Sequence, residues 1–145
     1  MKRFAWKLQR VLDVTAQRER VLRGDLLALG QTIAGVRESI LRRQAELRTV
    51  LGDLARQAAG VRLAEQAIFM ACVETEKRFL EALRVRLAQL EAQREEKRQA
   101  FLRTRATRRG LERLRAEARA QHLREAGRRE QTDFDEAAHV AYARA

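Results

Sequence analysis

Apolar residues along the first half of the chain recur at alternating steps of three and four positions. Between Leu22 and Ile68, 12 of the 14 positions on this pattern are apolar. The positions are Leu22, Leu26, Leu29, Ile33, Val36, Ile40, Arg43, Leu47, Val50, Leu54, Gln57, Val61, Ala64 and Ile68. Such steps keep side chains on one face of a helix, so the pattern predicts a coiled-coil seam and not a strand.

A second seam with the same alternation follows in the second half of the chain. It comprises Leu80, Leu83, Leu87, Leu90, Arg94, Lys97 and Phe101. Its phase differs from that of the first seam. In one straight helix the apolar stripe would have to jump sideways between Ile68 and Leu80, whereas a chain that reverses direction has no such requirement. The change of phase therefore predicts a turn.

Gly60 is the nearest residue that could end the first helix, because glycine readily adopts the left-handed conformation at a helix C-terminus. We expect an all-α fold, a long antiparallel two-helix coiled-coil hairpin that forms a single domain over residues 1–145. Helix one is expected at about 4–59, the reversal at about 60–70 and helix two at about 70–142. Other glycines offer competing breaks, but each lies within a continuing pattern and does not force a stop. They are Gly24, Gly30, Gly35, Gly110 and Gly127.

The composition agrees with this architecture. The chain has no proline, 5% aromatic residues and 35% charged residues, which is typical of long helices that fill only a narrow seam. Two helices cannot supply the convergent walls of a substrate pocket. No phosphate-binding loop, catalytic triad pattern or paired cysteine motif is present. We therefore predict a protein that is not an enzyme and that binds its partners along its outside.

The net charge of +11 predicts acidic partners. Of the 31 cationic residues, 27 are arginine, and residues 94–129 carry a net charge of +8. A basic helix of this kind is a possible nucleic-acid binder. Glutamates are interleaved throughout, however, and few aromatic rings are available for base stacking. Nucleic acid is thus not the expected partner, but it remains an alternative from a different functional class.

The first residues carry charges at positions 2, 3, 7 and 10 and lack the apolar core of a signal peptide. The longest uncharged run, Leu26 to Val36, has 11 residues, and a bilayer span needs about 20. The single cysteine, Cys72, excludes an internal disulfide and fits a reducing compartment. We expect a soluble cytoplasmic protein.

The end of the chain turns acidic, with a net charge of −3 over residues 130–145. Glu136 and His139 have the Glu-x-x-His spacing that places two metal ligands on one helix face. Di-iron helical bundles need this motif twice, and no second copy surrounds His122. We therefore predict no metal and no cofactor. The helix instead carries separate basic and acidic sections, which can dock against a partner in only one orientation.

Three stretches together resemble the flagellar FliJ family. They are "FAWKLQRVLDVTAQRE" from Phe4 to Glu19, "FLEALRVRLAQLE" from Phe79 to Glu91, and "LERLR" at Leu111 to Arg115 followed by "EQTDFDEAA" at Glu130 to Ala138. They occur in the expected order over almost the whole chain. One position departs from the family, which often has tyrosine shortly before the Phe-Leu segment. Here Glu76 lies three residues before Phe79.

The resemblance implies a component of the flagellar type III protein export apparatus. Members of the family form a stalk-like coiled coil that binds the hexameric export ATPase, links it to the membrane export gate and escorts export chaperones. They act in flagellum biogenesis and hence in motility and chemotaxis. The implied location is the cytoplasm, at the face of the membrane where the apparatus is attached. The equivalent stalk protein of a virulence injectisome is the nearest alternative.

We expect two contact surfaces on this stalk. The end that carries both termini would enter the ATPase ring, and its candidate contact residues are Phe4, Trp6, Leu8, Arg10, Leu12, Leu111, Arg113, Leu114, Arg115, Asp135 and Glu136. The candidate residues for the gate or the chaperones are Phe79, Leu83 and Leu87. These three residues fit an interpretation as plain seam residues equally well.

Overall fold

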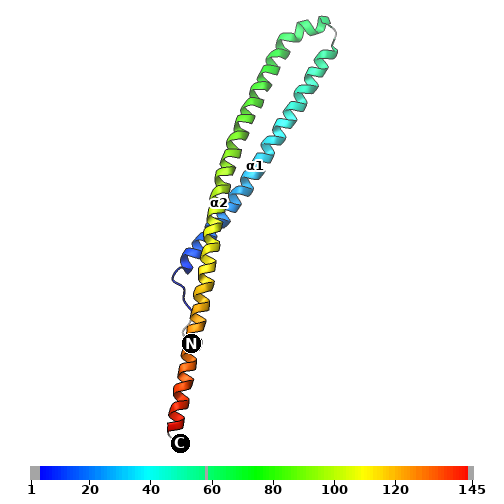
Figure 1. Ribbon diagram of the computed structural model, residues 1–145. Coiled ribbons are helices and arrows are strands. Elements are labelled where there is room, and N and C mark those ends of the chain that lie inside the picture. Colours follow the sequence, from blue (N-terminus) through cyan, green and yellow to red (C-terminus); the bar gives the residue numbers. More distant parts are fainter. Residues whose placement is uncertain (1–3, 58, 144–145) are drawn as a thin grey trace. The chain divides into compact units, whose positions relative to one another are not determined.

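A computed structural model describes residues 4–57 and 59–143, except for the side chains of residues 59–64. All the regular structure in these ranges is helical. Helix α1 covers Gln9–Arg56 and helix α2 covers Ala59–Ala143, with lengths of 48 and 85 residues. Figure 1 shows the two helices. The expected all-α fold with two long helices that pack against each other is confirmed.

Helix α1 begins at Gln9, five residues later than the expected start near residue 4. The chain enters the helix through a turn in which the Gln9 amide donates a hydrogen bond to the Trp6 carbonyl oxygen, at 3.1 Å. The Gln9 side chain then donates to the Asp13 carboxylate, at 2.9 Å. The first of these bonds satisfies a backbone N–H that the first turn of a helix would otherwise leave unpaired.

The reversal between the helices lies earlier than expected. Helix α1 ends at Arg56, where the Gln57 amide donates to the Leu54 carbonyl oxygen at 3.3 Å, and α2 has begun by Ala59. The expected reversal at about 60–70 is thus wrong, because those residues belong to α2. Gly60 also lies inside α2, and no glycine among the described residues has a positive φ. The left-handed glycine cap expected at Gly60 is therefore absent.

The chain divides into two compact units, each containing a segment of both helices. We call Leu22–Ala100 the central unit, and Met1–Val21 with Phe101–Ala145 the terminal unit. The single domain expected from the chain length stays a prediction.

The core of the central unit is built from both predicted seams. Val36 and Ile40 of α1 are buried against Leu80 of α2. Four half-buried leucines extend this cluster, namely Leu47, Leu83, Leu87 and Leu90. Ile33, at 2% exposure, is the most deeply buried large side chain of the unit. Each apolar stripe therefore removes the other from water.

Ion pairs between the helices show their direction in the central unit. Asp25 of α1 pairs with Lys97 of α2 at 2.5 Å, and Arg37 pairs with Glu91 at 2.6 Å. Further along α1, Arg43 pairs with Glu76 at 2.9 Å. Later positions of α1 meet earlier positions of α2, so the segments run antiparallel, as they do side by side in Figure 1.

Three positions predicted to lie in the two seams are exposed instead. Ile68 is 68% exposed, because it lies in α2 but follows the phase of the first seam. Continued backwards from Leu80, the second seam instead reaches Val73, which is buried, and Phe69, which is half-buried. Val50 and Arg94 are also exposed, although each continues a predicted seam. Val61 and Ala64 lie outside the described side chains.

The two isoleucines Ile33 and Ile68 provide a test of this packing. We expect Ile33→Ala to lower the free energy of unfolding by about 2–5 kcal/mol, because it removes fully buried methylene and methyl groups. Ile68→Ala makes the same chemical change on an exposed side chain and should cost within about 0.5 kcal/mol. Urea unfolding followed by circular dichroism measures both values. Equal losses would contradict the corrected seam.

Candidate functional site

The terminal unit brings the start of the chain against α2. The ring of Phe4 packs on the ring of His122, with centroids 5.5 Å apart and planes inclined by 51°. This geometry suits the attraction between the edge of one aromatic ring and the face of another. Phe4 and Trp6 are both half-buried. The segment before α1 is therefore positioned by side-chain packing.

The candidate ATPase-contact residues differ in how accessible they are. Leu12 is buried at 6% exposure and Leu111 is half-buried, so both side chains contribute to the packing of the terminal unit. Exposed side chains make up most of the remainder, namely Leu8, Arg10, Arg113, Leu114, Arg115, Asp135 and Glu136. Nothing in the structure tests their contact with an ATPase, and all the assigned roles stay predictions.

A buried ion pair lies in the terminal unit where a seam residue would ordinarily be apolar. Glu19 of α1 is 5% exposed, and its carboxylate accepts a hydrogen bond from Nε of Arg108 on α2. One terminal nitrogen of Arg108 donates to Glu112 at 2.5 Å, one turn further along α2. The guanidinium thus bridges a carboxylate on each helix.

These bonds further favour the charged form of the arginine. The hydrogen bond to Glu19 raises the pKa of Arg108 above its ordinary value, and the hydrogen bond to Glu112 raises it further by a smaller amount. A raised pKa stabilises the folded state at every pH below the ordinary arginine value. The contribution is therefore present throughout the physiological range and would be lost only in strong alkali.

Sequence reasoning missed this pair, although the pattern contains it. The first seam, continued backwards from Leu22 by the same steps, reaches Glu19, Thr15 and Leu12. The second seam, continued forwards from Phe101 by the same alternation of steps, reaches Thr104 and Arg108. A pair of opposite charges at seam positions of two antiparallel helices was the available clue.

The three candidate gate or chaperone residues of the central unit also differ from one another. Leu83 and Leu87 pack against the hydrophobic core, which agrees with the interpretation that they are seam residues. Phe79 is 51% exposed, and the guanidinium carbon of Arg43 lies 5.0 Å from the centre of its ring. This is a cation–π distance. Of the three, Phe79 alone is exposed.

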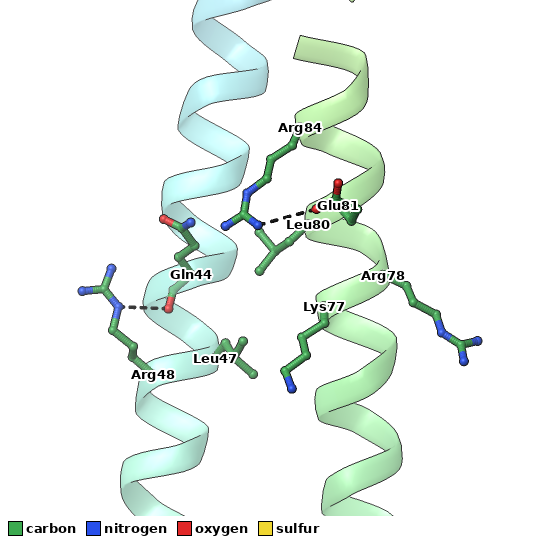
Figure 2. A pocket seen from close by; sticks show the side chains of 8 residues that line it. All are labelled: Gln44, Leu47, Arg48, Lys77, Arg78, Leu80, Glu81 and Arg84. Carbon is green, nitrogen blue, oxygen red and sulfur yellow. Dashed lines mark hydrogen bonds and ion pairs between the residues drawn. The ribbon is translucent and has the colours of Figure 1, made fainter. Parts of the chain in front are cut away.

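An open groove of about 800 Å³ lies along the two helices in the central unit. Figure 2 shows the side chains that line it. They are Gln44, Leu47 and Arg48 from α1, and Lys77, Arg78, Leu80, Glu81 and Arg84 from α2. Four cations and one carboxylate thus surround two leucines. Such a groove can bind an extended or helical segment, but it does not enclose a small substrate.

The acidic end of α2 carries Glu136 and His139, the pair with the spacing of metal ligands. Asp135, Glu136 and His139 line one shallow hollow there. Within residues 4–57 and 59–143, no group of three or more such side chains is arranged to hold a metal ion. In the same part of the chain, no helix is long and apolar enough to cross a bilayer.

Comparison with known proteins identifies one family. A family model described as "Flagellar FliJ protein" matches residues 4–145, which is nearly the whole chain. Neither the curated proteins nor the solved structures contain a significant match. The family match confirms the resemblance seen in the three quoted stretches.

The buried ion pair generates a prediction for the terminal unit. Glu19→Ala should lower the urea midpoint of unfolding, because it leaves the partly buried Arg108 with Glu112 as its remaining bonded carboxylate. Glu117→Ala removes one negative charge from an exposed position of α2 and should leave the midpoint unchanged.

The double variant Glu19→Leu/Arg108→Leu completes the experiment. Its midpoint should return to the wild-type value or exceed it, since apolar pairs often replace buried ion pairs without loss of stability. A Glu19→Ala midpoint equal to that of Glu117→Ala would show that the pair does not stabilise this unit.

Proposed function

Since the chain belongs to the flagellar FliJ family, we propose that it is a stalk-like component of the flagellar type III protein export apparatus. In this proposal it binds the hexameric export ATPase, connects the ATPase to the export gate and escorts export chaperones. It performs no catalysis itself. The observation that carries the proposal is the family match over residues 4–145.

The geometry supports a binding role. Two antiparallel helices pack through single apolar stripes, and their charged outer faces remain available to other proteins. The terminal unit is proposed to enter the ATPase ring. Arg113, Leu114 and Arg115 are exposed on α2, while Leu8 and Arg10 are exposed where α1 begins. Cations beside apolar side chains are common in protein interfaces.

A mechanism follows from the unequal charge along α2. The stretch 94–129 carries +8 and the segment 130–145 carries −3, so the charge pattern along α2 is asymmetric. A stalk that contacts one subunit state more favourably than the others shifts the ring towards that state. Nucleotide turnover then changes although the stalk does no chemistry. The proposed location is the cytoplasmic face of the membrane, through the export apparatus.

The ion pairs within α2 argue against a nucleic-acid function. Arg84, Arg98 and Arg129 each pair with a glutamate three or four residues earlier on the same helix. Such neighbours lower the positive potential that a phosphate backbone would meet. Duplex DNA should therefore bind weakly and with a steep dependence on salt, and tight binding at physiological ionic strength would favour the alternative.

The ATPase assay tests the proposal directly. Addition of the full chain to the purified cognate export ATPase should raise its rate of hydrolysis several-fold and promote ring assembly. The variant Arg113→Glu/Arg115→Glu should lose most of this effect, because two exposed cations of the proposed contact become anions.

A control variant separates a local contact from total charge. Arg86→Glu/Arg94→Glu makes the same change in net charge at exposed positions of the central unit and should stimulate hydrolysis as the wild type does. The stalk proposal would be refuted if the wild-type chain had no effect at stoichiometric amounts. Equal losses in both variants would instead refute the assignment of the contact to Arg113 and Arg115.

A further inference from the structure

The groove of the central unit combines apolar and cationic side chains from both helices. Figure 2 shows Leu47, Leu80 and Lys77 directed into the space between the helices. Arg48 and Arg78 also line the groove, but their guanidinium groups point outward, away from that space. Leu80 belongs to the buried core and Leu47 packs against that core. The apolar floor is therefore held rigidly by the packing of the two helices.

The cations around this floor are only partly neutralised. Lys77 pairs with Glu74 at 3.2 Å and Arg84 pairs with Glu81 at 3.7 Å, and the four side chains are more than half exposed. Exposed pairs of this kind exchange partners at little cost, since each contributes at most about 1 kcal/mol.

The other two cations of the groove are more available still. Nε of Arg48 donates a hydrogen bond to the Gln44 backbone carbonyl oxygen at 3.2 Å. The two terminal nitrogens of Arg48 take no part in this bond. No ion pair of Arg78 occurs within the described residues, and its side chain is exposed. With one carboxylate, Glu81, among four cations, the groove keeps an excess of positive charge.

We propose that this groove binds an acidic amphipathic helix of a partner protein. Apolar side chains of that helix would lie over the half-buried Leu47, beside the buried Leu80, and its carboxylates would pair with Arg48, Lys77, Arg78 and Arg84. Side chains spaced three and four positions apart on one helix would reach the floor together, as in other complexes of a helix with a groove. The proposal adds a second binding surface for the gate or the chaperones beside the contact expected at Phe79, and it rests on the proposed function.

The lining favours a helix over nucleic acid. A phosphate backbone would use the cations but not the leucines. Among the lining residues no aromatic ring is present on which a base could stack. An acidic amphipathic helix uses both the charge and the apolar floor.

The groove also differs from the contact expected around Phe79. Leu83 and Leu87 are engaged in the core, and the ring of Phe79 is covered in part by Arg43. Neither Phe79 nor these leucines line the groove. The two surfaces can therefore be tested by separate substitutions.

The experiment measures binding of a synthetic peptide to the full chain by fluorescence anisotropy. The probe is a helical peptide of about 18 residues, or about 27 Å, with leucines three and four positions apart and glutamates on either side. A second peptide keeps the glutamates and replaces the leucines by serines. The wild-type chain should bind the leucine peptide at physiological ionic strength at least about tenfold more tightly than the serine peptide.

Two matched variants locate the binding. Arg48→Glu/Arg78→Glu should weaken binding of the leucine peptide by about tenfold or more, because two edges of the groove become repulsive. Arg86→Glu/Arg94→Glu makes the same change in net charge in the same unit outside the groove, and should weaken binding by less than about threefold. Circular dichroism checks that both variants remain helical.

Three results would overturn the proposal. The first is that both variants weaken binding of the leucine peptide equally, and the second is that the wild type binds the two peptides equally. The third is that duplex DNA binds the wild type more tightly than the leucine peptide does and loses affinity in the Arg48→Glu/Arg78→Glu variant. A failure of the proposed function is recognised separately, as a wild-type chain that does not stimulate the export ATPase. Stimulation with no groove-dependent peptide binding would refute this inference alone.

Discussion

The packing depends on one narrow apolar stripe along each helix, which stays out of water only while the other helix covers it. In the central unit Val36 and Ile40 of α1 lie against Leu80 of α2, and half-buried leucines continue the contact on both sides. A stripe this narrow leaves most of each helix surface exposed and charged. The same constraint that holds the helices together therefore makes the outer faces available for binding.

Charged residues within the seam add specificity to this packing. An apolar stripe of repeated leucines allows neighbouring registers of similar energy, whereas a buried ion pair is satisfied in one register. Glu19 and Arg108 meet in this way in the terminal unit, with Glu112 as the second acceptor of the arginine. In the central unit the half-buried Arg43 and Glu76 make the equivalent contact at 2.9 Å. We infer that these pairs select the register while the leucines supply most of the stability.

The periodic pattern was sufficient to predict two antiparallel helices, because the steps of three and four identify a buried face without any knowledge of its partner. The position of the turn could not be obtained in the same way. Ile68 continued the first seam by chance, and Gly60 resembled a helix end, yet both lie in α2. The phase of the second seam, which already holds at Val73 and Phe69, was the better guide. The groove was not predictable, since its lining comes from two helices whose register is set by contacts distant in the sequence.

The antiparallel pairing can be measured directly as a distance in solution. Spin labels at Arg37→Cys and Glu91→Cys, with Cys72→Ser to remove the native thiol, report the separation of two positions that are 54 residues apart and form an ion pair. The axes of helices in contact lie about 8–10 Å apart. Pulsed electron paramagnetic resonance should therefore give a narrow distribution of label-to-label distances, centred within about 20–25 Å once the label arms are included. A single continuous helix would place the labels about 80 Å apart at 1.5 Å per residue, and a distribution centred there would contradict the account.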